Sequence, residues 1–276
     1  MQYSMEMNYT LSTLRKLSSI FSLLMLITVS AWAQQKDSTG LIAHDVILYN
    51  SDPLGNIYYT DNRQVLSKYD KNAKRTITYS NMKNGRIGAI DVNNPMRIMV
   101  YYPDFFLIKF LDANLAEINS YNIREAYSDG MVKLICSSNN NGFWMYDESN
   151  RTLLKIAYNF SSEQESGDLF QILGRDVAPL CMIEKGDELF LSDPDVGIMV
   201  FDLFGGSKKI IPIKGIKEFS IEKDVMYYFT GNKIMGYGLK TRSEELKTFF
   251  TDKDIDAAKP YLNKSLVMKQ GSLYLK

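Results

Sequence analysis

One strand-like segment of this 276-residue chain recurs at a nearly constant spacing. Each copy is a run of aromatic and aliphatic residues that ends at a turn residue. The copies end at Asp61, Asp104, Asp147, Asp193 and Gly231, so the spacings are 43, 43, 46 and 38 residues. Another step of similar length reaches Leu273-Tyr274-Leu275 near Lys276. A period of this length is typical of a four-stranded β-propeller blade.

The segments on either side of each copy repeat as well, which indicates four strands per unit. Strand-like segments precede the copies at residues 87–92, 132–136, 179–183 and 219–221, and follow them at 106–111, 153–158 and 198–201. A fourth strand is expected at 77–79, 116–121, 209–213 and 246–250. A helical turn or a loop insertion is expected only in residues 161–173 and 252–262. Because no long stretch has a 3.6-residue apolar period, the sequence predicts an all-β fold.

The repeats predict a β-propeller, a ring of sheets that leaves few strand edges exposed. Six end points predict six blades. The last blade is expected to be incomplete, with two strands at residues 265–268 and 272–275. The first expected strand, residues 42–49, could help to close the ring against it. Five blades with an open or irregular closure is the alternative.

The opening repeat, Gly55–Asp70, reads as two short strands joined by a polar turn. Asp52-Pro53-Leu54-Gly55-Asn56-Ile57-Tyr58-Tyr59-Thr60-Asp61, with Lys68-Tyr69-Asp70, resembles the blades of NHL-type six-bladed propellers. The likeness covers most of residues 45–276, but later repeats lack the Gly-Asn pair. The resemblance implies a propeller fold and transfers no active site.

Residues 1–33 have the three-part pattern of a secretory signal peptide. Arg15 and Lys16 precede an apolar run at residues 20–32, and Ala31-Trp32-Ala33 predicts cleavage before Gln34. The run is shorter than the roughly 20 residues that a membrane span needs. The sequence therefore predicts a leader at 1–33, a linker at 34–41 and one propeller domain at 42–276. We expect an exported protein, periplasmic or extracellular, with no transmembrane segment after signal removal.

Charge and motif content exclude several classes of function. The chain has 32 basic and 32 acidic residues, so it lacks the basic excess of a nucleic-acid-binding protein. No glycine-rich phosphate loop leads from a strand into a helix, and no cofactor is expected. His44 is the single histidine, which excludes a histidine-based triad or metal cluster. Cys136 and Cys181 lack metal-ligand spacing, and we expect both to stay reduced inside strands.

The acidic residues that end the repeats are the best-defined polar feature. A ring of these carboxylates could bind a cation or a polyol, but the favoured interpretation is that each one bonds its own turn. No metal site is therefore predicted. Aromatic residues beside one such turn could contact a ligand. The candidate ligand-binding residues are Asp61, Asp104, Asp147, Asp193, Tyr102 and Phe105.

The hypothesis that best fits these features is an exported, non-enzymatic binding or scaffold propeller. It would use one loop face to bind a partner protein or a component of the cell envelope, since a rigid scaffold with variable loops suits binding. The alternative is a metal-assisted lyase or hydrolase acting on sugar or lactone substrates. Propellers host both kinds of function, so the fold does not decide between them.

Overall fold

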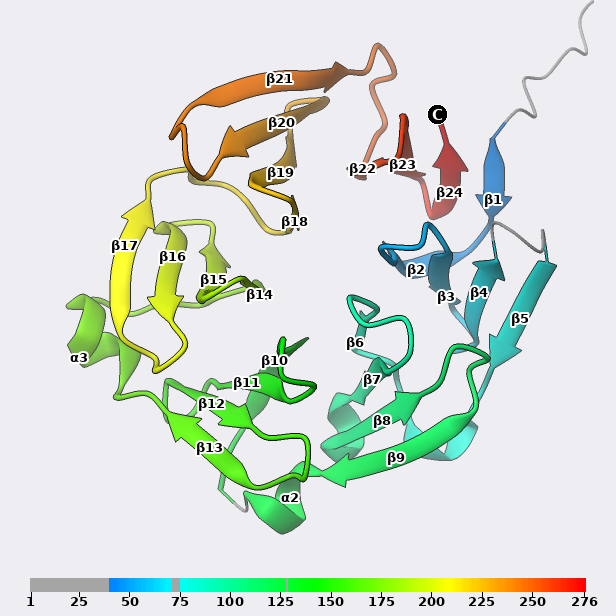
Figure 1. Ribbon diagram of the computed structural model, residues 1–276. Coiled ribbons are helices and arrows are strands. Elements are labelled where there is room, and N and C mark those ends of the chain that lie inside the picture. Colours follow the sequence, from blue (N-terminus) through cyan, green and yellow to red (C-terminus); the bar gives the residue numbers. More distant parts are fainter. Residues whose placement is uncertain (1–39, 71–74, 128) are drawn as a thin grey trace, which may run out of the picture. The chain divides into compact units, whose positions relative to one another are not determined.

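Six antiparallel sheets of four strands follow one another along the chain and are arranged radially (Figure 1). The computed structural model describes residues 40–70, 75–127 and 129–276. The expected leader and most of the expected linker lie outside the described residues. The predicted all-β propeller with six four-stranded blades is confirmed. Within the described ranges, no helix has the length and apolar character needed to cross a membrane.

In the first five blades the chain runs outward from an innermost strand. The first blade contains β2 (Val46–Ser51), β3 (Ile57–Asp61), β4 (Leu66–Asp70) and β5 (Arg75–Tyr79). The second contains β6 (Ala89–Asp91), β7 (Ile98–Tyr102), β8 (Leu107–Leu111) and β9 (Glu117–Asn122). The third contains β10 (Val132–Ser137), β11 (Phe143–Asp147), β12 (Thr152–Ile156) and β13 (Ser162–Glu165).

The remaining blades follow the same order until the ring closes. The fourth contains β14 (Cys181–Lys185), β15 (Glu188–Asp193), β16 (Gly197–Asp202) and β17 (Ser207–Ile211). The fifth contains β18 (Phe219–Glu222), β19 (Val225–Thr230), β20 (Lys233–Gly238) and β21 (Glu244–Phe249). The sixth contains β22 (Ala257–Tyr261), β23 (Lys264–Lys269), β24 (Ser272–Leu275) and, as its outer strand, β1 (Leu41–Ala43).

The way the ring closes corrects four expectations. The sixth blade is complete, because β1 pairs with β24 and places Leu41 opposite Tyr274. The single strand expected at residues 42–49 is therefore two strands of different blades, separated at Asp45, which has a left-handed φ of 54°. The expected loop or helical turn at 252–262 contains β22. The five-blade alternative is wrong.

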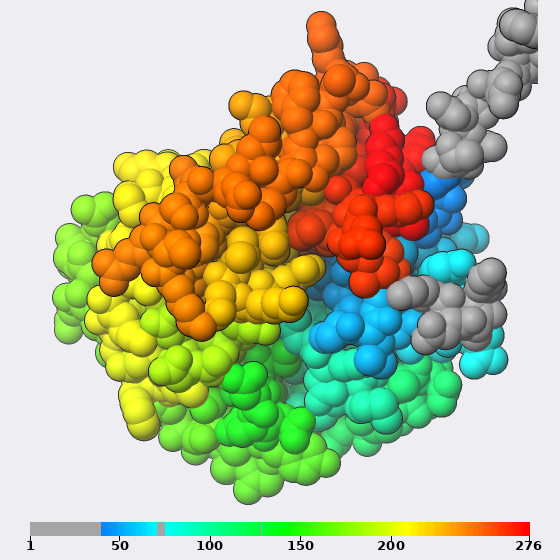
Figure 2. Space-filling model, turned by 45° about the horizontal axis from the view of Figure 1, so that its top comes forward, coloured from blue at the N-terminus to red at the C-terminus, as the bar shows by residue number. Residues whose placement is uncertain are grey.

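The hydrophobic core lies between neighbouring blades. Successive side chains of a strand point to opposite faces of its sheet, so each blade packs against the blades on both sides of it. Trp144 on β11 is fully buried between the third and fourth blades, in a cluster with Leu153 and Met199. Atoms of the fifth blade (orange) also abut those of the sixth (red) in Figure 2. Between these two blades, Ile234 packs in one buried cluster with Val267.

The two ends of the blades differ in their loops. Because the strands alternate in direction, the turns between second and third strands lie at the same end as the connections between blades. We name this end the connection face and the other end the hairpin face. The short helices in the described part of the chain all belong to the connection face: η2 (Met82–Asn84), η3 (Pro103–Phe105), α2 (Ile123–Ala126) and α3 (Leu169–Leu173).

Candidate functional site

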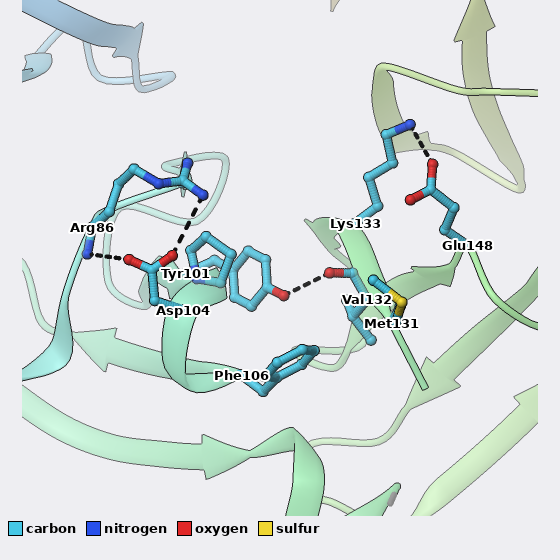
Figure 3. Close-up of a pocket in the computed structure, with 10 residues that line it drawn as sticks. Arg86, Tyr101, Asp104, Phe106, Met131, Val132, Lys133 and Glu148 are labelled. Carbon is cyan, nitrogen blue, oxygen red and sulfur yellow. Dashed lines mark hydrogen bonds and ion pairs between the residues drawn. The ribbon is translucent and has the colours of Figure 1, made fainter. Parts of the chain in front are cut away.

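A pocket of about 360 Å³ opens between the second and third blades at the connection face. Its walls come from the segments that enter the two blades and from the turns that follow their second strands (Figure 3). The lining residues are Arg86, Gly88, Tyr101, Pro103, Asp104, Phe106, Met131, Val132, Lys133 and Glu148. The volume falls at the lower end of the range for small-molecule sites.

An ion pair forms the wall contributed by the second blade. Arg86 Nη2 lies 3.6 Å from Asp104 Oδ1, and the Arg86 backbone N–H donates to Asp104 Oδ2 at 3.0 Å. Pro103 starts the 3₁₀ turn η3, which carries Asp104. A proline is favoured there because its fixed φ suits the first turn of a helix. The turn therefore holds the carboxylate beside the incoming strand.

A second ion pair forms the wall contributed by the third blade. Lys133 Nζ lies 2.7 Å from Glu148 Oε1. Lys133 belongs to β10, and Glu148 directly follows β11. The Glu148 N–H donates to the carbonyl oxygen of Met131 at 2.9 Å, so the backbone around the pair is fixed as well.

Tyr101 and Phe106 supply the aromatic part of the pocket. Tyr101 is 2% exposed, and its hydroxyl donates to the carbonyl oxygen of Val132 at 2.6 Å, which links the two blades. Burial also raises the pKa of Tyr101 to about 12. The Arg124 guanidinium lies 4.2 Å from the centre of the Phe106 ring and holds this ring in place.

The predicted carboxylates stay within their own blades, and Asp104 is the one that lines the pocket. Asp61 accepts from the N–H groups of Arg63 and Val65, both at 3.0 Å. Asp147 and Asp193 each bond an N–H group of their own turn. They also bond an N–H of the segment that enters their blade: Met131 to Asp147 at 3.0 Å and Ala178 to Asp193 at 2.7 Å.

The two predicted aromatic residues lie in different surroundings. Tyr102 is 1% exposed and packs in the cluster between the first and second blades, so ligand contact would require it to become accessible. Phe105 is 57% exposed on the connection face, directly beside the pocket residues Asp104 and Phe106. The structure thus brings two predicted residues, Asp104 and Phe105, to the pocket region.

Sequence reasoning missed most of the pocket, although a signal exists. Arg86 and Lys133 stand about one repeat apart, and so do Asp104 and Glu148. The second and third blades thus each pair a basic residue near the first strand with an acidic residue after the second strand. An alignment of the repeats would show this pairing, whereas only the structure shows that the two pairs face one pocket.

Other chemically reactive side chains lie apart from the pocket. His44 Nδ1 lies 3.0 Å from the Ser272 hydroxyl, beside the closing strand β1. Cys136 and Cys181 are free thiols, and burial raises the pKa of both, to about 12 for Cys181. No group of three or more His, Cys, Asp or Glu residues that could hold a metal occurs in the described part of the chain.

Comparison with known proteins finds similar structures but no match to a family model or a curated sequence. A streptogramin B lyase structure is similar, with a TM-score of 0.59 at 14% identity over 84% of this chain and 79% of that one. A catalytically inactive His-to-Ala variant of virginiamycin B lyase from Staphylococcus aureus, with quinupristin, gives 0.58 at 12% identity, over 84% and 80% of the two chains.

Extracellular domains have the same kind of likeness. The extracellular domain assigned to a hybrid two-component system of B. thetaiotaomicron gives a TM-score of 0.56 at 14% identity. The match covers 88% of this chain and 35% of that protein, so this chain corresponds to about a third of it. At such low identities, the likenesses show the six-bladed propeller fold alone.

Proposed function

We propose that the protein is an exported, non-enzymatic propeller that binds a component of the cell envelope through its connection face. The observation that carries this proposal is the pocket between the second and third blades, which combines an apolar floor with two ion-paired walls. A few oriented polar groups around an apolar concavity are the usual composition of a ligand site.

The surroundings of the pocket support binding of a large partner. Met82 is 86% exposed, Phe105 57% and Met131 59%, and all three belong to the connection face. Gly85 brings the loop of Met82 against Phe105, because a Cβ on Gly85 would lie within 3.2 Å of that ring. Exposed apolar side chains around a polar-rimmed pocket are typical of interaction surfaces. The leader pattern and the extracellular structural neighbours favour an envelope location.

A photo-cross-linking experiment tests this function. The photoreactive residue p-benzoylphenylalanine replaces Phe105 on the connection face or, as the control, Phe204, which is 74% exposed on the hairpin face. With its leader intact, the protein is irradiated in cells. We expect defined envelope cross-links from position 105 and none from position 204. Equal cross-linking from both positions, or none from either, would contradict the proposal.

The lyase alternative has a direct test of its own. Two structural neighbours are streptogramin or virginiamycin B lyases, and the inactive variant of one lacks a histidine. In this chain, His44 is hydrogen-bonded to Ser272 between the sixth and first blades, away from the pocket. We expect no lyase product by mass spectrometry when the protein is incubated with quinupristin. If product forms and His44→Ala abolishes it, the lyase alternative would replace the binding proposal.

A further inference from the structure

We infer that the pocket between the second and third blades binds a neutral, hydroxyl-rich ring, the chemistry of an uncharged sugar residue. The inference rests on the proposed function, because it names the chemical class of the envelope component that this face would bind. Four properties of the pocket carry it: the balance of its charges, the accessibility of its ion-paired side chains, the hydrogen bonds that its backbone groups already make, and its apolar lining.

The charges of the pocket cancel in pairs. Arg86 is matched by Asp104 across 3.6 Å, and Lys133 by Glu148 across 2.7 Å. A charged ligand would have to compete with one of these pairs and leave its other member unmatched. A hydroxyl group both donates and accepts, so it can bond an ion pair without separating it. Each wall therefore suits neighbouring hydroxyls on a neutral molecule.

The side chains on these walls remain accessible. The Asp104 and Glu148 side chains are each 47% exposed, and that of Arg86 is 60% exposed. Lys133 is 29% exposed. Carboxylate oxygens have several acceptor positions, and guanidinium and ammonium groups have several donors. Both walls thus keep hydrogen-bonding capacity beyond their own ion pair.

The backbone around the pocket is already bonded, which disfavours a peptide added as a strand. The Val132 carbonyl accepts from Tyr101, and the Met131 carbonyl accepts from the Glu148 N–H. The Gly88 N–H donates to the Tyr101 carbonyl at 2.8 Å. Peptide recognition by strand addition needs free main-chain donors and acceptors along an edge. The pocket offers side-chain hydrogen bonds instead, as a polyhydroxy ligand requires.

The floor suits the apolar C–H face of a sugar ring. Phe106 and Pro103 line the pocket, the exposed Met131 borders it, and Figure 3 shows the Phe106 and Tyr101 rings between the two ion pairs. Gly88 has no side chain, and a Cβ there would lie 2.8 Å from the Pro103 ring. The Tyr101 hydroxyl is used by Val132, so Tyr101 contributes a ring rather than a free polar group. The pocket therefore presents apolar groups between two ion-paired sides.

The test uses full-length mature protein labelled with ¹³C at the methionine methyl groups. Met131 is assigned with Met131→Leu, and the probes are glucose, galactose, mannose and N-acetylglucosamine. Glucuronate, glucosamine and N-acetyltryptophanamide serve as the anionic, cationic and peptide-like comparisons. We expect a saturable shift of the Met131 signal with at least one neutral sugar, stronger than with the three comparisons. No sugar-induced shift up to about 20 mM, a concentration that detects millimolar affinity, would overturn the inference. So would a preference for a charged or peptide-like probe.

Two matched variants identify the walls as the binding groups. Glu148→Gln removes the charge of one wall, and we expect about ten-fold weaker sugar binding, as for loss of a charged hydrogen-bonding partner. Asp224→Asn is the control, because it breaks the Lys240–Asp224 pair, 2.9 Å long, on the hairpin face of the fifth blade. We expect this control to leave sugar affinity unchanged. Equal weakening by both variants would overturn the assignment.

The two proposals can fail separately. If Phe105 cross-links persist while no sugar shifts Met131, the sugar site is overturned and envelope binding stands. If neutral sugars bind but position 105 gives no cross-link, the sugar site stands and the proposed partner interaction falls. If neither occurs, both proposals are overturned.

Discussion

The seam between the third and fourth blades and the seam between the fifth and sixth blades solve the same packing problem differently. The first, which we name the middle seam, buries a cluster of eleven residues that includes Trp144, Tyr146 and Phe201. The second, which we name the closing seam, buries a cluster of five, in which Phe250 and Ile255 belong to the connection that enters the sixth blade. The middle seam therefore removes more apolar surface from water, and its hydrophobic stabilisation should be larger.

The polar contacts of the two seams differ as well. In the middle seam, the buried Glu184 accepts from the Trp144 indole N–H and the Ser138 hydroxyl, both at 2.6 Å. In the closing seam, Lys259 pairs with Glu218, and Lys276 pairs with Asp252. The Glu218 side chain is 50% exposed and that of Asp252 37%. Burial and uncharged donors stabilise one seam, whereas the other relies more on ion pairs whose carboxylates are solvent-exposed, although the Lys259 side chain is only 12% exposed.

The largest expected effect is in the middle seam. Trp144→Ala should lower the free energy of unfolding by about 3–5 kcal/mol, because it leaves a cavity and removes a donor from Glu184. Urea denaturation of both proteins measures the difference. Trp144→Phe is the matched control, since it keeps an aromatic ring but lacks the N–H, and it should cost less. A loss below about 1 kcal/mol for Trp144→Ala would show that this seam does not dominate stability.

The corresponding change in the closing seam should be smaller. Ile234 is fully buried on β20, in contact with the cluster of Val267 and Phe250. Ile234→Ala should cost about 2 kcal/mol, at the lower end for a buried isoleucine, because the connection that carries Phe250 can relax into the space. The same urea experiment checks it. A cost equal to that of Trp144→Ala would remove the distinction between the seams.

The sequence predicts the middle blades more accurately than the closing region, and the physical reason is local. Segments such as Phe143–Asp147 are continuous apolar strands that end at a turn-forming Asp, and both properties are visible in one short window. The β22 segment, Ala257–Tyr261, contains Pro260 and no such run, so it resembles a loop. The pairing of β1 with β24 joins the two ends of the domain, and no local pattern reports it.

The candidate site shows the same limit. The acidic residues that end the repeats are visible in the sequence because each one lies in a local turn, and Asp104 lines the pocket. Phe106 has a left-handed φ of 53°, a conformation that its sequence does not suggest. The pocket itself depends on two blades standing side by side, and this arrangement is a tertiary property. Repeat-level comparison would find the charge pairs but not their convergence.

An intermediate effect should appear at acid pH in the middle blades. Burial alone would raise the pKa of Asp147, but hydrogen bonds from Ser149, Asn150 and the Met131 N–H hold it below its ordinary value of 3.8. A lowered folded pKa stabilises the fold above the unfolded value, and this contribution is lost as pH falls through the folded pKa. Asp147→Asn should cost about 1–2 kcal/mol at pH 7 and less at pH 2.

Urea denaturation at the two pH values measures this difference. Asp224→Asn, on an exposed ion pair of the hairpin face, is the control and should show little change at either pH. If Asp147→Asn lowers the free energy of unfolding equally at pH 7 and pH 2, the ionised, hydrogen-bonded Asp147 carboxylate does not stabilise the fold as predicted.

The smallest expected effect concerns salt, and it separates the seams most directly. Exposed ion pairs are typically worth no more than about 1 kcal/mol and weaken as the Debye length falls to about 3 Å at 1 M salt. Raising NaCl from low concentration to about 1 M should therefore loosen the closing seam, while the middle seam is screened much less because Glu184 is buried. Hydrogen exchange of β22 and β23 amides should accelerate relative to β14 and β15 amides in the same molecule.

Lys259→Met should produce a similar acceleration at low salt and reduce the further effect of NaCl, because the ion pair with Glu218 is already absent. Faster exchange in β14 and β15 instead would mean that the buried carboxylate, rather than the exposed pairs, is the salt-sensitive element.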